Sequence, residues 1–291
     1  MLEETVMNTT PANSVFDDAY QRQVADWWNN RRNDAVNLAL GDIDKFYHHH
    51  CGVGAIDEAV LAEPPETREQ SIIAELHRLE TAQANYLLDH LGPLTRADRV
   101  LDAGSGRGGL SFMANLRFGC RVDGVSISQY QVDFATEQAA ERGVADQVHF
   151  WFRNMLHTEF EDQSMQAIWN NESTMYVDLD DLFRELSRLL RPGGRYVCIT
   201  GCYNDILGPK SSEMAYIDGH YHCDFHSRSD YFRAMAANNL TPIKVIDLSL
   251  EMIPYWELRA KSSVATGIES HFLSSLRDRT AQYLLIVADR V

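Results

Sequence analysis

Short apolar segments alternate with segments of helical periodicity from about residue 98 to the end of the chain. The apolar segments, each bounded by polar or glycine residues, are residues 99–103, 121–125, 148–152, 167–170, 195–200, 243–248 and 283–288. The segments with apolar side chains at helical spacing are residues 109–118, 129–142, 179–190 and 227–239. This alternation predicts an α/β fold with a doubly wound, Rossmann-like parallel sheet, which binds ligands at the carboxyl ends of its strands.

The first 97 residues have a different pattern, which is mostly helical. Residues 17–30 and 68–91 carry apolar side chains at intervals of three and four, as amphipathic helices do. We therefore expect residues 1–97 to form a helical cap over the mouth of the sheet and residues 98–291 to form the ligand-binding domain. No internal repeat or low-complexity linker separates the two parts, so we expect them to form one functional unit.

Composition narrows the possible partners. The chain has 291 residues and a formal net charge of −16, and it has no run of Lys or Arg, which argues against nucleic acid or an anionic membrane as a partner. An anionic small-molecule substrate would therefore need a local basic pocket or a divalent metal. The five cysteines form no C-x-x-C pair, and neither a signal peptide nor a membrane span is visible, so we expect a cytoplasmic protein.

A glycine-rich turn follows the first apolar segment, in the sequence Val100-Leu-Asp-Ala-Gly-Ser-Gly-Arg-Gly-Gly109. Gly104 and Gly106 allow the backbone to approach a ligand closely, and the helix that follows directs its N-terminal amides at that ligand. A dinucleotide site would have the spacing G-x-G-x-x-G and an acid about 20 residues later. Here Asp102 precedes the glycines, so the turn favours S-adenosylmethionine, although a dinucleotide site or a structural turn remains possible.

Four later positions agree with a methyl-donor site. Ser128 and Gln131 follow the second apolar segment, where a ribose or amino-acid moiety would lie. Asn154 and Met155 follow the third, where an amide and a soft apolar side chain suit an adenine ring. Each alone could equally belong to a polar loop, but their order along the chain indicates a methyltransferase.

The fourth apolar segment ends in Asn170, Asn171 and Glu172, beside the expected position of the donor methyl group. We expect Asn170 to contact the donor and Glu172 to act as a base. An alkene acceptor attacks with its π electrons, becomes a carbocation and must then lose a proton, and a carboxylate partly dehydrated by Trp169 and Tyr176 suits that step. A structural, hydrogen-bonded acid is the alternative.

Two further clusters suggest how an anionic acceptor is held. Tyr47-His-His-His-Cys51 lies in the cap, and Arg259 follows Tyr255 and Trp256 late in the chain. Three consecutive histidines point in different directions, so they suit separate hydrogen bonds better than one zinc site. Aromatic rings stabilise a transient cation. The rings expected around such a cation are Trp27, Trp28, Tyr47, Tyr176, Tyr203, Tyr221 and Phe225.

With these motifs the chain resembles the geranyl diphosphate C-methyltransferases, which methylate prenyl diphosphates. The resemblance runs from about Tyr20 to Val291, and its most specific block is Trp169-Asn-Asn-Glu172. The other blocks are residues 47–50, 72–80, 101–109, 173–179, 199–203 and 253–263. The resemblance implies the fold of a class I S-adenosylmethionine-dependent methyltransferase, Mg²⁺ carried on the diphosphate, no direct protein metal site, and a homo-oligomer.

The resemblance also implies roles for individual residues. Glu172 would be the general base, with Tyr176 and Tyr221 beside the reacting carbon. The residues expected to bind the acceptor are Asn37, Tyr47, His48, His49, His50, Cys51, Tyr203, Tyr255 and Arg259.

Two positions depart from the family pattern. Cys51 stands where the family usually has Tyr, and Tyr221 stands where it has Phe. Both positions belong to the acceptor pocket, so the acceptor is either geranyl diphosphate or the five-carbon isopentenyl diphosphate. A cyclopropane-forming or small-molecule O- or N-methyltransferase on the same scaffold is the alternative activity, and a non-catalytic donor-binding protein is a third.

Overall fold

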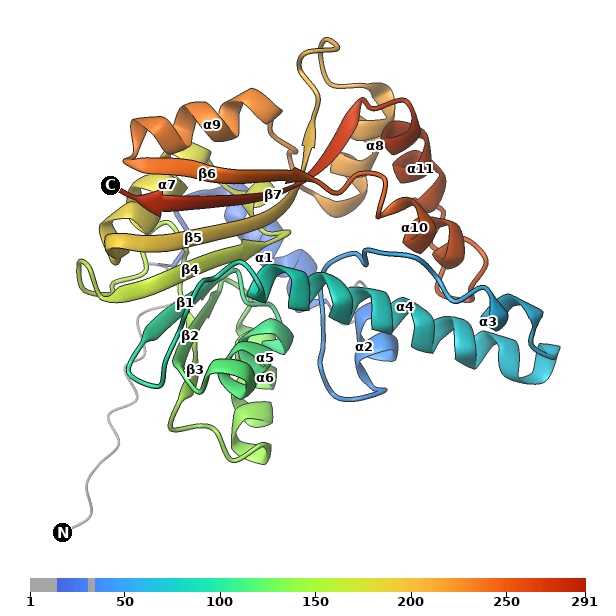
Figure 1. Cartoon of the computed structure of the whole chain (residues 1–291), viewed down its shortest axis with the longest axis horizontal. Helices are drawn as coiled ribbons and strands as arrows, with labels where there is room; N and C mark the ends of the chain where they lie inside the picture. The colour runs from blue at the N-terminus through green and yellow to red at the C-terminus, as the bar shows by residue number, and fades with distance from the viewer. Residues whose placement is uncertain (1–14, 31–34) are drawn as a thin grey trace.

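A computed structural model of the chain describes residues 15–30 and 35–291. Its centre is a seven-stranded sheet in the order β3-β2-β1-β4-β5-β7-β6 (Figure 1). The strands are β1 (Arg99–Ala103), β2 (Arg121–Ser126), β3 (Val148–Phe152), β4 (Met165–Asn171), β5 (Leu190–Tyr203), β6 (Leu240–Asp247) and β7 (Ala281–Arg290). All seven lie where the apolar segments predict them, and β1 and β3 have the predicted bounds.

The expectation of a parallel sheet is wrong at β7, which runs antiparallel to both of its neighbours. β7 begins at Ala281 opposite Tyr203, the last residue of β5, and its Leu284 pairs with Asp247, the last residue of β6. The chain between β6 and β7 therefore stays at the carboxyl edge of the sheet. Because β7 starts from that edge, it has to run in the opposite direction.

Alternate residues of each strand supply two apolar cores, one on each face of the sheet. Val100 and Val122 belong to one core, whereas Leu101 and Val125 belong to the other. The helices that follow the strands are α5 (Gly109–Phe118), α6 (Gln129–Glu141), α7 (Leu179–Leu189) and α9 (Arg228–Ala237). Their bounds agree with the predicted helical segments to within two residues.

Helices from both ends of the chain gather beside the carboxyl edge of the sheet (Figure 1). The N-terminal ones are α1 (Ala19–Asn29), α2 (Ala35–Gly41), α3 (Ala59–Ala62) and α4 (Pro65–Leu88). The sequence pattern does not predict three further helices, α8 (Ser212–Tyr221), α10 (Ile253–Arg259) and α11 (Glu269–Arg277), of which α10 packs on α4 and α11 on α8. The division of the chain at residue 97 stays a prediction.

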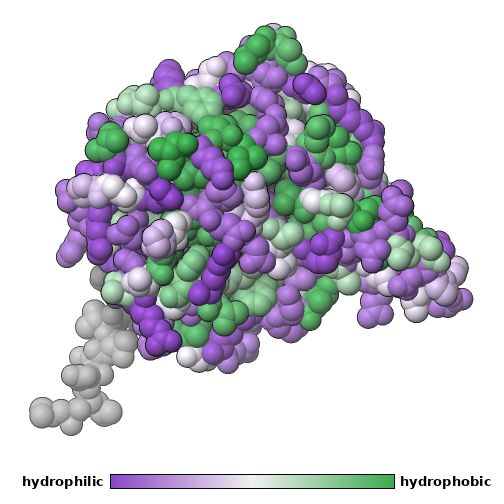
Figure 2. Space-filling view, in the orientation of Figure 1, coloured by the Kyte–Doolittle hydropathy of each residue, from purple (hydrophilic) through white to green (hydrophobic). Residues whose placement is uncertain are grey.

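The surface seen in Figure 2 is mostly hydrophilic, with small hydrophobic groups between the polar side chains. Exposed Ile206 and Leu207 lie in the loop between β5 and α8, and exposed Ile243 and Val245 lie on β6. None of the helices in the described ranges has the length and apolar character that a membrane span requires.

Candidate active site

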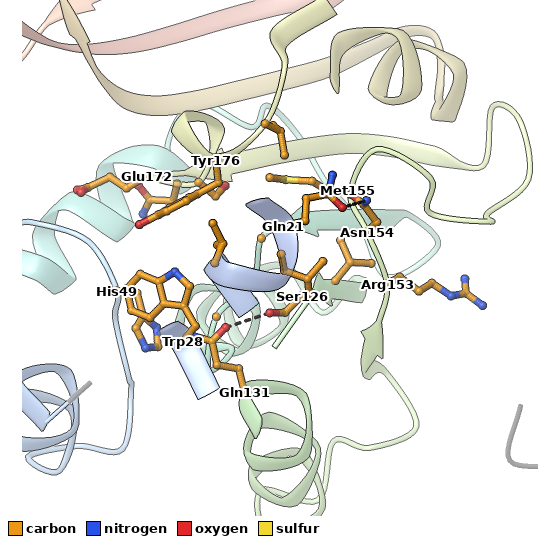
Figure 3. Close-up of a pocket in the computed structure, with 18 residues that line it drawn as sticks. Gln21, Trp28, His49, Ser126, Gln131, Arg153, Asn154, Met155, Glu172 and Tyr176 are labelled. Atoms are coloured by element: carbon orange, nitrogen blue, oxygen red, sulfur yellow. Dashed lines mark hydrogen bonds between the residues drawn. The ribbon is translucent and has the colours of Figure 1, made fainter. Parts of the chain in front are cut away.

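Two cavities meet at the carboxyl edge of the sheet. The donor cavity, of about 680 Å³, is lined by the turn after β1, by residues 125–127 and 153–155, and by α1 (Figure 3). The acceptor cavity, of about 840 Å³, is lined by residues of α1, α8, α10 and α11. Four side chains line both cavities: Trp28, His49, Glu172 and Tyr176. A group bound in one cavity can therefore reach a group bound in the other.

The glycine turn forms the floor of the donor cavity. Gly104 and Gly106 line the cavity and have φ of 89° and 53°, in the left-handed region that favours glycine. A Cβ at Gly104 would lie 2.5 Å from Ser173 Cβ, and one at Gly106 would lie 2.6 Å from His49 Nδ1. The turn thus requires glycine for its conformation, and also because Ser173 and His49 already occupy the positions that the two Cβ atoms would take.

Replacing Gly104 with alanine should weaken donor binding at least tenfold. The new Cβ overlaps Ser173, whose hydroxyl donates to the Ala103 carbonyl at 2.8 Å, so the loop has to move away from the ligand. Isothermal titration with S-adenosylmethionine measures the change. Gly219→Ala is the control, because its Cβ would have no atom within 4 Å. Equal donor affinity in both variants would contradict this account of the loop.

Ser126 and Gln131 form one wall of the donor cavity, where Ser126 Oγ donates a hydrogen bond to Gln131 Oε1 at 3.0 Å (Figure 3). Asp102 lies beneath the glycine turn, beside a smaller cavity, and accepts a hydrogen bond from Ser111 Oγ at 2.6 Å. Burial raises the pKa of Asp102 to about 7. Asp102 is therefore only partly ionised at neutral pH, and it is not among the residues that line the donor cavity.

Besides Asp102, two more of the predicted donor contacts lie behind the cavity wall. Ser128 caps α6 and donates to Asn29 Oδ1 at 2.8 Å, so it ties α1 to α6. Asn170 is fully buried and donates to the Ala103 carbonyl at 2.6 Å. Neither is among the residues that line the donor cavity. We propose that both hold the cavity wall in place and do not touch the donor.

Helix α1 lines the donor cavity, and the sequence analysis did not predict its Gln21 as a residue of that cavity. Gln21 and Trp28 of α1 line the cavity together with Asn154 and Met155 (Figure 3). Asn154 Nδ2 donates to Gln21 Oε1 at 2.9 Å. Gln21 stands at the same helical spacing as Val24 and Trp28, so a polar residue on the apolar face of this helix was the available signal.

Glu172 follows β4 directly, with its N–H bonded to the Ile199 carbonyl and with φ of 50°. The Cys51 N–H donates to Glu172 Oε1 at 2.6 Å, and the Cys51 thiol donates to Oε2 at 3.4 Å. Gln83 Nε2 donates to Oε1 at 3.3 Å. The carboxyl group is thus fixed between the two cavities by donors from the residue 51 loop and from α4.

Burial raises the pKa of Glu172 to about 8, and the hydrogen bonds from Cys51 oppose the shift. Burial also raises the pKa of the Cys51 thiol, which keeps it protonated as a donor. A carboxylate with a raised pKa holds an abstracted proton more firmly than an ordinary one. These properties suit a general base.

Polar side chains form part of the lining of the acceptor cavity. Arg259 is 8% exposed, lines the cavity and lies 3.2 Å from Glu269. Asn37 and His50 line the same cavity. His50 Nδ1 lies 3.0 Å from the Cys51 carbonyl, which only accepts, so Nδ1 carries the hydrogen. Since burial lowers the pKa of His50 to about 4, the ring is neutral and its Nε2 is an acceptor.

Aromatic and apolar side chains line the rest of the acceptor cavity. Tyr176, Tyr221 and Phe225 are among them, and the rings of Trp256 and Phe272 stack at 4.0 Å. A cavity with one cationic side chain and several rings fits an apolar chain that carries an anionic group.

The remaining predicted acceptor residues lie around the cavity and do not line it. Tyr47 and His48 border the small cavity beside Asp102. Tyr255 is buried, with its hydroxyl bonded to Glu80 Oε1 at 2.8 Å. Lys210 Nζ lies over the Tyr203 ring, 5.5 Å from the ring centroid. We propose that these four residues support the site through packing.

The profile of the methyltransferase domain family matches residues 100–194, which include the glycine turn and β4. A geranyl diphosphate 2-C-methyltransferase of Saccharopolyspora erythraea is 57% identical over 96% of this chain and 98% of its own. The chain belongs to the geranyl diphosphate C-methyltransferase family. The resemblance and the class I methyltransferase fold predicted from the sequence are therefore confirmed.

Solved structures of family members carry ligands. A geranyl diphosphate methyltransferase in complex with geranyl diphosphate and sinefungin is 53% identical, with a TM-score of 0.92, and the match covers 94% of this chain and all of that one. The Streptomyces coelicolor enzyme was solved with Mg²⁺, geranyl diphosphate and S-adenosyl-L-homocysteine. It is 50% identical, with a TM-score of 0.91, over 94% of this chain and 99% of its own.

Proposed function

We propose that this family member transfers the methyl group of S-adenosylmethionine to an alkene carbon of a prenyl diphosphate. The observation that carries the proposal is the position of Glu172, a half-buried carboxyl that lines both the donor and the acceptor cavity. Only a reaction that releases a proton between the two ligands requires a base there. Methylation of an alkene, followed by deprotonation of the carbocation, is such a reaction.

The donor fits the cavity formed by the glycine turn. Gly104 and Gly106 line the cavity without side chains, Gln131 and Ser126 offer polar contacts, and Met155 offers an apolar one. Bound S-adenosylmethionine supplies an electrophilic methyl group on a cationic sulphur. We propose that the glycine turn directs this group toward the wall that Glu172 and Tyr176 share with the acceptor cavity.

The diphosphate would lie beside the polar side chains of the acceptor cavity, with Arg259 as its cationic contact and Asn37 as a hydrogen-bond donor. Mg²⁺ accompanies the diphosphate in the relatives, and oxygen donors such as the Asn37 amide suit that metal. The neutral His50 offers an acceptor for a water molecule on the metal. These contacts fix the acceptor, so much of the rate enhancement would come from positioning and exclusion of water.

The rings beside Glu172 would then stabilise positive charge on the acceptor carbon. Tyr176, which lines both cavities with Glu172, and Tyr221, which lines the acceptor cavity, would take this role. Glu172 would take the proton next to the cationic carbon, which restores a double bond and leaves the diphosphate attached. Among residues 15–30 and 35–291, no other carboxyl group lines both cavities.

Geranyl diphosphate, the acceptor in the name of the relatives, is the first candidate acceptor. Isopentenyl diphosphate is the second. Cys51, which lines the acceptor cavity and bonds to Glu172, stands where the family usually has a tyrosine ring. A panel of five-, ten- and fifteen-carbon diphosphates with labelled donor and Mg²⁺ separates the candidates. Label in a homologated diphosphate is expected. Label only in hydroxyl, amine or lipid acceptors, or donor binding without turnover, would refute the proposal.

The rate should rise with pH as Glu172 loses its proton. Because burial raises the pKa of Glu172 to about 8 in the free protein, kcat/KM for the donor should increase up to about pH 8. A bound cationic donor favours the ionised form of Glu172 and so lowers its pKa. The midpoint of the rise in kcat should therefore lie at a lower pH than the midpoint of the rise in kcat/KM. Profiles of kcat and of kcat/KM from pH 5 to 10 measure both midpoints. Identical midpoints for kcat and kcat/KM would contradict the coupling between Glu172 and the donor.

We further propose a cytoplasmic homo-oligomer in which residues 1–97 act as the cap. Five buried free cysteines suit a reducing compartment. Exposed Ile206 and Leu207 supply apolar surface for contact between copies. Light scattering of the purified protein tests the assembly, and a monomer at micromolar concentration would refute it.

A further inference from the structure

Phe225 is a buried residue that lines the acceptor cavity. Two other apolar residues of that lining are its neighbours: Cys223 lies two residues before it, and the Met175 carbonyl accepts from the Asp224 N–H. If the diphosphate is held by Arg259 of α10 and the alkene lies beside Glu172, these apolar side chains are available to the rest of the alkyl chain. This step rests on the proposed function.

The backbone around Phe225 is held on several sides. The Phe225 N–H donates to Asp218 Oδ1 at 2.9 Å, and the Asp224 N–H donates to the Met175 carbonyl at 2.9 Å. The His226 carbonyl accepts from the Tyr203 N–H at 3.0 Å. The position of the ring is therefore set by its side-chain torsions and by what it packs against.

The ring packs against Gly201 of β5. A Cβ at Gly201 would lie 3.0 Å from Phe225 Cδ1 and closer still to Cε1. Gly201 is not among the glycines with positive φ, so its backbone conformation does not require glycine. The space that the ring occupies is the remaining reason for glycine at this position.

We propose that Gly201 and Phe225 together set the length of the acceptor that the enzyme uses. Glycine lets the ring lie back against the sheet, which deepens the acceptor cavity. A larger residue at 201 would push the ring into the cavity by about 1 Å to restore van der Waals distance, because the backbone on both sides of the ring is fixed. The cavity would then reject the longest acceptor first.

The test compares kcat/KM for ten- and five-carbon diphosphates in designed variants. Gly201→Ala should lower the ratio of ten- to five-carbon kcat/KM at least tenfold, a size typical of lost pocket space. Phe225→Leu should raise that ratio at least tenfold, and the double variant should return toward the wild type. Gly219→Ala adds the same methyl group where its Cβ would meet no atom within 4 Å, and it should leave the ratio unchanged.

A crystal structure of Gly201→Ala should show the Phe225 ring displaced toward the acceptor cavity. Ratios within twofold of the wild type in active Gly201→Ala and Phe225→Leu proteins, or an unmoved ring, would overturn the inference while leaving the proposed function intact. A wild-type protein that methylates no prenyl diphosphate would instead overturn the proposed function. Loss of both activities in Gly201→Ala without recovery in the double variant would also overturn the inference, because a purely structural defect would explain it.

Discussion

Replacing Glu172 with glutamine should lower kcat by a factor of about 10²–10⁴, the usual contribution of a general base. Glutamine has nearly the same shape, and its oxygen can still accept from the Cys51 N–H and from Gln83. It cannot take up the proton that the cationic acceptor has to lose. Rapid-quench assays give kcat, and titration with S-adenosylmethionine should give a dissociation constant close to that of the wild type.

Glu185→Gln is the matched control for this variant. Glu185, like Glu172, is a carboxyl with several hydrogen bonds, and it is buried, but its partners are Thr158 and Arg188, and it lines neither cavity. If loss of a hydrogen-bonded carboxylate acted only through stability, both variants would lose activity in step with their melting temperatures. A Glu172→Gln protein with a kcat within threefold of the wild type would remove Glu172 from the proposed chemistry.

Replacing Arg259 with glutamine should lower kcat/KM for the prenyl diphosphate by about 10²-fold or more, since removing one partner of a buried charge pair costs about 2–5 kcal/mol. The effect is expected mainly in KM, while donor affinity stays unchanged. The net charge of −16 repels an anionic acceptor at long range, so a local cation matters more here than in a neutral protein. Steady-state kinetics with each substrate varied in turn separate the two constants.

Removal of Arg259 also leaves Glu269 without its cation, 3.2 Å away. The double variant Arg259→Gln/Glu269→Gln removes that buried charge and should recover thermal stability without recovering acceptor affinity. Arg188→Gln, which changes the net charge equally at a position that lines neither cavity, should leave KM unchanged. Recovery of KM in the double variant would show that Arg259 acts on folding alone.

The strand pattern was readable from the sequence because each strand is a short apolar run bounded by polar or glycine residues. β1 and β3 were predicted with their correct ends for that reason. The direction of β7 was not readable, because an apolar strand has the same composition whichever way it runs. Only the placement of residues 248–280 at the carboxyl edge determines it.

The site was predictable where a residue follows a strand, and less so where a helix brings it in. Glu172, Asn154 and Met155 follow β4 and β3 directly, and the structure places all three at the cavities. Gln21 and Gln83 come from helices distant in sequence, and their only signal was a polar side chain on an apolar helix face. Ser128 and Asn170 show the opposite error. Their places near strand ends predicted contacts with the donor, but in the structure their side chains hydrogen-bond to Asn29 and to the Ala103 carbonyl.

The left-handed backbone of Glu172, with φ of 50°, has a cost outside the reaction. A residue with a side chain typically loses about 1–2 kcal/mol in this region, whereas glycine does not. Glycine at position 172 would relieve this local penalty, but it would abolish the base and remove the acceptor of the Cys51 N–H and of Gln83. The bonds that hold the base therefore also offset the strain of its backbone, and variants that have lost these bonds are the ones in which selection for thermal tolerance alone should favour glycine at 172.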